Sequence, residues 1–181
     1  MSAASPRFPA FSRVLHWVMA VLVLAMLFIG VGMAASVSQR YSLLVSIHKP
    51  IGVAILLLVI IRFVNRLINR PPPLPSTMPF VQKLAAHASH IVLYALMLVL
   101  PLVGWGMLSA AGYPIVLFGS LQLPPILSKS PAVYAELREL HTIFAYLLFL
   151  TVVVHLMAAL FHGLIRRDGV LESMASWRSN R

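Results

Sequence analysis

The chain has 181 residues, of which 60% are hydrophobic, whereas soluble domains are about 45–50% apolar. Its mean hydropathy of +0.92 excludes an ordinary soluble domain and indicates a membrane protein. The net charge of +10 comes from 14 Lys and Arg against four acidic residues. These cations flank apolar blocks, which indicates bilayer orientation and not nucleic-acid binding. The chain has no cysteine, which excludes disulfides, Cys-ligated iron–sulfur clusters and covalently attached haem.

Four apolar segments are each long enough to cross about 30 Å of hydrocarbon, a distance that takes about 20 helical residues. We therefore predict an all-α integral membrane protein, a four-transmembrane-helix bundle that forms one domain over residues 1–181. The predicted spans cover residues 13–35, 43–66, 84–108 and 137–165.

The amino-terminal segment resembles a signal peptide, with two arginines, an apolar run and small residues at 34–36. The apolar run over residues 17–35 exceeds the roughly 7–15 residues typical of such a core. We therefore expect a retained span. A helix that starts near Pro9, a favourable first-turn residue, would set His16 deeper and let Arg13 reach back to the interface.

The second and third spans are joined by a proline-rich stretch, residues 70–75, which cannot continue a helix. The connection over residues 112–131 is also rich in proline. Its apolar residues 115–118 predict a segment that lies in the membrane interface without crossing it.

The charges near the span ends predict that both termini lie in the cytoplasm, because Lys and Arg concentrate on that side of a membrane. Ten cations fall on the side of the termini and four on the other side. The ten are Arg7, Arg13, Arg62, Arg66, Arg70, Lys83, Arg166, Arg167, Arg178 and Arg181, and the four are Arg40, Lys49, Lys129 and Arg138.

Four histidines lie inside the predicted spans, where ionisable side chains are costly and are therefore functional candidates. His141 and His155 are fourteen residues apart in the fourth span. An α-helix turns about 100° and rises about 1.5 Å per residue, so this spacing is within roughly 40° of four full turns and spans about 21 Å. Both rings therefore point from one helix face at two depths. With the predicted topology, His48 matches the outer level of His141 and His16 matches the inner level of His155.

Two depth-matched histidine pairs predict a membrane cytochrome with two haem b groups, because two porphyrins stacked across a bilayer need this arrangement. His16 and His155 would bind the inner haem iron, and His48 and His141 the outer one. The alternative for these four residues is a set of hydrogen-bonded core histidines or a proton relay.

The same fourteen-residue offset indicates two further haem contacts. Gly30 lies fourteen residues beyond His16, so a porphyrin could rest against its backbone at the outer level. Arg62 lies fourteen residues beyond His48, at the depth of an inner haem propionate. The alternatives are ordinary small-residue helix packing for Gly30 and an anchor at the membrane interface for Arg62.

Span three carries His87 and His90 at its cytoplasmic end. These residues are candidates for hydrogen bonds or protons to a quinone head group near the inner haem. One alternative is that both are interfacial histidines solvated by lipid head groups. Another alternative is that one of them replaces His16 as the ligand of the inner haem. His162, seven residues after His155, is expected to be an interfacial or propionate partner and not an iron ligand.

Several short motifs of the chain lie in or next to the predicted spans, at residues 15–17, 47–52, 59–62, 86–90, 140–141 and 154–155. With these motifs the chain resembles the bacterial cytochrome b561 family of four-helix di-haem membrane proteins. The resemblance covers nearly the whole chain and implies a bacterial inner-membrane location and bis-histidine haems held by the same four residues. The stand-alone members of the family resemble superoxide oxidase, which oxidises periplasmic superoxide and reduces ubiquinone.

The leading functional hypothesis is therefore electron transfer from periplasmic superoxide to ubiquinone. Lys49, Arg40 and Arg138 lie on the predicted outer face and would steer a small anion, although Glu136 and Glu139 weaken that field. The alternative is that these cations merely flank helix ends. One alternative is a cytochrome subunit that exchanges electrons with a partner redox enzyme of hydrogenase or dehydrogenase type. Another alternative is a proton or metal transporter that uses the histidines.

Overall fold

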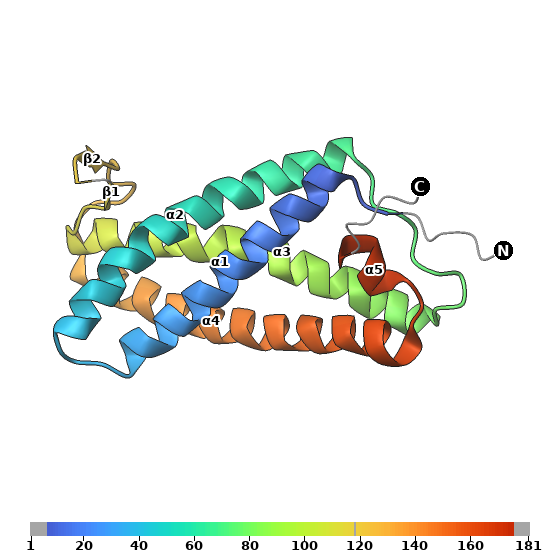
Figure 1. The fold of residues 1–181 in the computed structure, drawn as a ribbon. Coiled ribbons are helices and arrows are strands. Elements are labelled where there is room, and N and C mark those ends of the chain that lie inside the picture. The colour runs from blue at the N-terminus through green and yellow to red at the C-terminus, as the bar shows by residue number, and fades with distance from the viewer. Residues whose placement is uncertain (1–6, 118, 176–181) are drawn as a thin grey trace.

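The computed structural model describes residues 7–117 and 119–175. Four long helices form a bundle in which each helix runs opposite to the one before it (Figure 1). All four are long and apolar enough to cross a membrane, in agreement with the four predicted spans. Each helix begins three to six residues before its predicted span. The helices are α1 (Ala10–Ala34), α2 (Gln39–Ile68), α3 (Phe80–Ala111) and α4 (Pro131–Leu160).

The helix starts follow from capping chemistry. α1 begins directly after Pro9, as predicted, which places His16 in the second turn of that helix. α4 begins after Ser130, whose hydroxyl accepts a hydrogen bond from the Val133 N–H at 3.4 Å. α3 ends at Gly112, where φ is 76° and a side chain would be strained.

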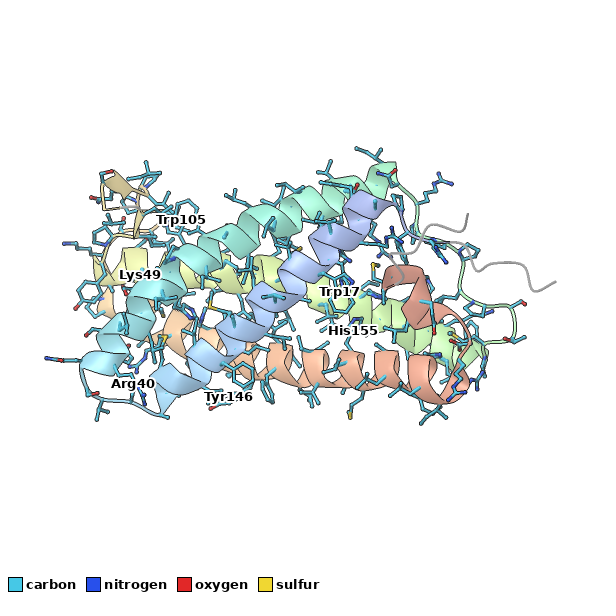
Figure 2. All side chains as sticks on the ribbon, in the orientation of Figure 1. Trp17, Arg40, Lys49, Trp105, Tyr146 and His155 are labelled. Carbon is cyan, nitrogen blue, oxygen red and sulfur yellow. The ribbon has the colours of Figure 1, made fainter. Side chains whose placement is uncertain are left out.

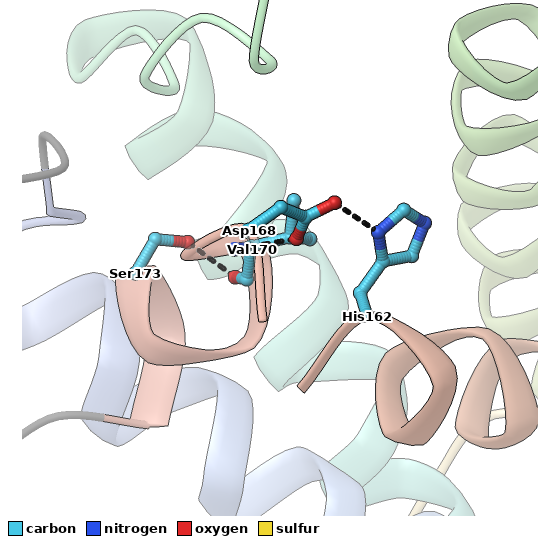
Figure 3. Close-up of polar contacts among 4 residues, drawn as sticks. All are labelled: His162, Asp168, Val170 and Ser173. Atoms are coloured by element: carbon cyan, nitrogen blue, oxygen red, sulfur yellow. Dashed lines mark hydrogen bonds and ion pairs between the residues drawn. The ribbon is translucent and has the colours of Figure 1, made fainter. Parts of the chain in front are cut away.

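The end of α4 departs from a regular helix. It continues into one stretch of π-helix, η1 (Phe161–Arg166), and the chain then folds back as the short helix α5 (Val170–Ala175). Nδ1 of His162 lies 2.6 Å from Oδ2 of Asp168, while the other carboxylate oxygen accepts the Val170 N–H at 3.3 Å (Figure 3). This contact ties the last turn of the bundle to the start of α5.

α5 is also tied to the start of α1. The indole N–H of Trp17 donates to the carbonyl of Met174 at 3.2 Å, and the N–H of Phe8 donates to the carbonyl of Ser173 at 3.2 Å. α5 therefore lies at the end of the bundle where α1 begins (Figure 1). His16, next to Trp17 in sequence, is at this same end.

The connection between α3 and α4 folds onto the opposite end of the bundle. It forms an antiparallel hairpin of β1 (Val116–Leu117) and β2 (Leu121–Gln122). Ile115 and Leu117 are buried, so these apolar residues pack against protein where an interfacial segment was expected. Phe118, part of the same prediction, lies outside the described residues.

The buried core between the helices is small and mainly apolar. One buried cluster joins all four long helices through Val23, Ile55, Leu96 and Leu148, with neighbouring side chains packed against it. α1 packs mainly on α2 and α4 mainly on α3, while α1 and α4 have little direct contact. Large apolar side chains cover the outer faces, as expected for helices solvated by lipid.

Ser109 fixes the hairpin to α3 and supplies a test of this packing. Its buried hydroxyl accepts the N–H of Ile126 at 3.1 Å and donates to the carbonyl of Trp105 at 2.8 Å. Ser109→Ala should leave the Ile126 N–H without its partner and destabilise the hairpin by about 1–3 kcal/mol. Limited proteolysis within residues 112–130 should therefore speed up.

Thr142→Ala is the matched control, because the Thr142 hydroxyl is exposed and donates only to the carbonyl of Arg138 in its own helix. Equal cleavage rates for the two variants would show that Ser109 does not hold the hairpin.

Candidate functional site

The outer histidine pair joins α2 to α4. The ring centroids of His48 and His141 are 6.2 Å apart, with an interplanar angle of 65°. Nδ1 of each ring is buried and makes no hydrogen bond of ordinary geometry, although the Leu100 carbonyl lies beside His141. Such a buried pair is costly in an apolar interior unless a partner is supplied.

Gly104 on α3 makes room for the outer pair. A Cβ placed at Gly104 would lie 3.2 Å from Cε1 and 3.5 Å from Nδ1 of His141. The missing side chain thus lets the imidazole lie close to the α3 backbone. The structure thus shows which ring this glycine accommodates.

The inner histidine pair joins α1 to α4. The ring centroids of His16 and His155 are 6.5 Å apart, with an interplanar angle of 70°. Figure 2 shows His155 and Trp17 in the part of the bundle towards α5. The two pairs therefore lie at two levels along α4, at the spacing that its sequence predicts.

The pair separations fit a metal ion held between two trans imidazoles. Metal–imidazole bonds are about 2.0–2.1 Å, and a ring nitrogen lies roughly 1.1 Å from its ring centre, so the centroids should be roughly 6.3 Å apart. The observed 6.2 and 6.5 Å bracket this value. The interplanar angle is unrestricted, because each ring can rotate about its metal–nitrogen bond.

Each histidine pair supplies only two ligands for a metal ion. Within residues 7–117 and 119–175, no group of three or more His, Cys, Asp or Glu side chains could hold an ion by itself. A haem provides four nitrogens in a plane and needs only two axial ligands, so the histidine pairs fit this cofactor.

His90 lies beside the inner pair. Its ring centroid is 5.4 Å from that of His155, with an interplanar angle of 73°. This separation is shorter than trans ligands of one metal ion require, so the geometry favours His16 over His90 as the partner of His155. His87 is separate: it is exposed, and its Nδ1 bonds to the Lys83 carbonyl at 2.7 Å.

Gly30 and Arg62 occupy different surroundings. A Cβ at Gly30 would meet no atom within 4 Å, so close helix packing does not explain this glycine. Arg62 is partly buried, and its Nη1 donates to the Ser12 carbonyl at 3.3 Å. Its guanidinium carbon is 6.0 Å from the centre of the Tyr94 ring. Arg62 therefore points into the bundle.

The predicted outer cations lie at the end of the bundle that carries the hairpin. Figure 2 shows Arg40 and Lys49 at this end, and Arg138 belongs to the early turns of α4 there. Arg40 and Arg138 are exposed, and Lys49 is half-buried. Lys129 has a structural role, since its side chain covers Gly112 at the C-terminus of α3, where a cation is favourable.

The fold, the four apolar helices and the two histidine pairs can now be set beside known proteins. The family model described as prokaryotic cytochrome b561 matches residues 7–177. The chain belongs to the prokaryotic cytochrome b561 family. It is therefore a membrane cytochrome of b type, a class whose cofactor is haem b.

Three curated relatives of this cytochrome b561 chain span most of its length. Cytochrome b561 homolog 2 of Escherichia coli K12 is 32% identical over 171 residues, 93% of this chain and 90% of the relative. Cytochrome b561 homolog 1 of the same organism is 26% identical over 93% of this chain and 96% of the relative. A protein of Yersinia pestis named probable superoxide oxidase CybB is 31% identical over 129 residues, 71% of this chain and 72% of the relative.

Gly104 provides a test of the outer pair in this cytochrome b561 protein. Gly104→Ala should lower the thermal unfolding midpoint, because the added methyl group would press on the His141 ring and overpacking costs about 1–3 kcal/mol. The measurement is thermal unfolding of the purified protein in detergent.

Gly106→Ala is the control on the same helix, since its Cβ would meet flexible methyl groups, those of Leu127 and Leu137 at 3.2 and 3.3 Å and that of Ile126 at 4.0 Å. Gly106→Ala should unfold at a higher temperature than Gly104→Ala. A lower unfolding temperature for Gly106→Ala than for Gly104→Ala would mean that the His141 ring does not depend on the missing side chain at Gly104.

Proposed function

We propose that the two histidine pairs hold two haem b groups at two depths of the membrane. His16 and His155 are the proposed ligands of the inner haem, and His48 and His141 of the outer haem. The observation that carries this proposal is the ring separation of 6.2 and 6.5 Å, close to the roughly 6.3 Å of trans imidazole ligands. Family membership supports haem b as the group held between the rings.

Haem b held by two histidines would supply single-electron transfer, because the iron would have no open position for a substrate. The chain's own part is to set the two levels. α4 separates its two histidines by about 21 Å along the helix axis, and α1 and α2 each contribute one opposing ring. The surrounding apolar side chains keep water out of the space between the levels.

Gly30 and Arg62 are proposed as additional haem contacts. Gly30 has open space where a side chain would be, which supports close approach of a flat ring at the outer level. Arg62 is an inward-pointing cation near the inner pair, which supports pairing with a propionate.

The charge distribution supports an orientation with both termini in the cytoplasm, in a bacterial inner membrane. Arginines and lysines concentrate at the end of the bundle where α1 begins. His48 and His141 would then lie near the periplasmic surface. His16, His155 and His90 would lie nearer the cytoplasmic surface.

The proposed reaction is oxidation of periplasmic superoxide with reduction of ubiquinone. Two superoxide anions each give up one electron and leave as O₂, and one quinone takes both electrons and two protons to become a quinol. Lys49 follows the ligand His48 directly, and Arg40 and Arg138 lie at the same end, which supports attraction of a small anion. The name of the Yersinia pestis relative points to the same substrate.

His90 is the better of the two candidates for the quinone end of the reaction. It lies against His155 at the inner pair and is half-buried, so it could hold a hydrogen bond or a proton for a bound quinone. His87 is exposed and bonded within its own helix, which favours a solvated interfacial role for it.

The two haems can be counted directly. The purified protein should show a b-type reduced-minus-oxidised spectrum and two pyridine haemochrome equivalents per chain. Replacing His16, His48, His141 or His155 singly by Ala should remove about one equivalent, because one axial ligand is lost.

His87→Ala and His90→Ala are the matched controls and should keep both haems. Loss of a haem in His90→Ala with retention in His16→Ala would transfer the inner ligand role to α3. A purified protein without haem would favour the transporter hypothesis.

Superoxide oxidation can be followed by stopped flow. Superoxide mixed with the oxidised protein should reduce the haems faster than it dismutates spontaneously. Lys49→Gln should slow this step at low ionic strength and lose its effect at high salt, since the steering is electrostatic.

Lys83→Gln removes the same charge at the opposite end of the bundle and should not change the rate. Arg138→Gln gives a second outer variant if Lys49→Gln loses haem. Haem reduction no faster than dismutation would reject superoxide as the donor. Copurification of a redox enzyme would then favour a subunit that exchanges electrons with a partner protein.

A further inference from the structure

A polar pocket lies between α1, α2 and α3 near the inner end of the bundle and is not part of either histidine pair. Its volume is about 20 Å³, enough for one or two oxygen-sized atoms. Seven residues line it: Phe8, Ser12, Arg62, Asn65, Arg66, Asn69 and Tyr94.

Two arginines converge on one aromatic ring in this pocket. The guanidinium carbons of Arg62 and Arg66 lie 6.0 and 5.7 Å from the centre of the Tyr94 ring. In the described part of the chain, neither arginine has a carboxylate within ion-pair distance. Two like charges this close repel, so an anion placed between them would be stabilised by both.

Amide and hydroxyl groups extend the cationic site towards its rim. The side-chain N–H of Asn69 donates to Asn65 at 2.9 Å, and that of Asn65 donates to the buried hydroxyl of Ser12 at 2.7 Å. Each amide NH₂ has two donors, and this chain of bonds uses one of each. The pocket thus offers several fixed N–H donors beside two positive charges, which is the donor set that phosphate oxygens require.

The pocket also lies at the right depth for a lipid phosphate. α2 has 30 residues and is therefore about 45 Å long, whereas about 20 residues cross the hydrocarbon. Arg66 and Asn69 belong to the last turn and the C-terminal cap of this helix. The surplus length allows these two residues to reach the level of the head groups, and Asn69 is exposed.

We propose that the rim of this pocket, formed by Arg66 and the Asn65–Asn69 amides, binds the phosphate group of an anionic phospholipid, while Arg62, deeper in the pocket, serves the inner haem propionate. The pocket admits one or two phosphate oxygens, while the glycerol and acyl chains remain outside in the bilayer. Basic pockets between membrane helices on the cytoplasmic side are suited to such head groups.

Native mass spectrometry of the haem-loaded protein in detergent tests this proposal. The probes are phosphatidylglycerol, phosphatidylcholine and inorganic phosphate. One phosphatidylglycerol per chain should bind more tightly than phosphatidylcholine. Arg66→Gln should weaken that binding about fivefold, because the guanidinium group that faces the phosphate is lost.

Arg166→Gln is the control, because it removes one exposed cation at the same end but outside the pocket. It should leave phosphatidylglycerol binding unchanged. Asn69→Ala, at the exposed rim, is a second pocket variant in case Arg66→Gln does not fold, and should weaken binding about twofold to threefold.

Inorganic phosphate that binds as tightly as phosphatidylglycerol would identify free phosphate, and not lipid, as the source of the anion. Equal phosphatidylglycerol affinity in Arg66→Gln, Asn69→Ala and Arg166→Gln would overturn the proposal. Loss of haem from Arg66→Gln would also overturn the proposal, because it would mean that Arg66 helps to hold the inner haem.

Discussion

Imidazole rings inside a membrane helix are costly to bury, and α4 buries two of them at a spacing of four helical turns. Each ring faces a histidine from another helix, α1 at the inner level and α2 at the outer level, and the inner ring also contacts His90 of α3. α1 and α4 have little direct contact, and the rings of each pair are far enough apart for one metal ion to fit between them. The fold, the cofactor class and the proposed direction of electron flow all depend on this arrangement.

Helical periodicity explains why so much of the site could be predicted from the sequence. The length of the apolar segments identified the four helices, and the fourteen-residue spacing paired the histidines by depth before any contact was known. Proline at the start of α1 explained how His16 reaches the level of His155. These properties are local or repeat along one helix, so a single chain reveals them.

Features that depend on tertiary packing could not be predicted in this way. His87 and His90 are only three residues apart, yet one is exposed and the other contacts His155. The π-helical end of α4 and the return of α5 to Trp17 have no periodic signature. The burial of residues 115 and 117 in a hairpin that packs on the bundle has no signature in the sequence either.

An experimental density map of the purified protein tests the central claim most directly. We expect two flat macrocycles, one between His48 and His141 and one between His16 and His155, with each iron bound by both imidazoles. Density in which side chains or lipid fill the space between either pair, with the rings bound to no metal, would contradict the assignment of that pair as haem ligands.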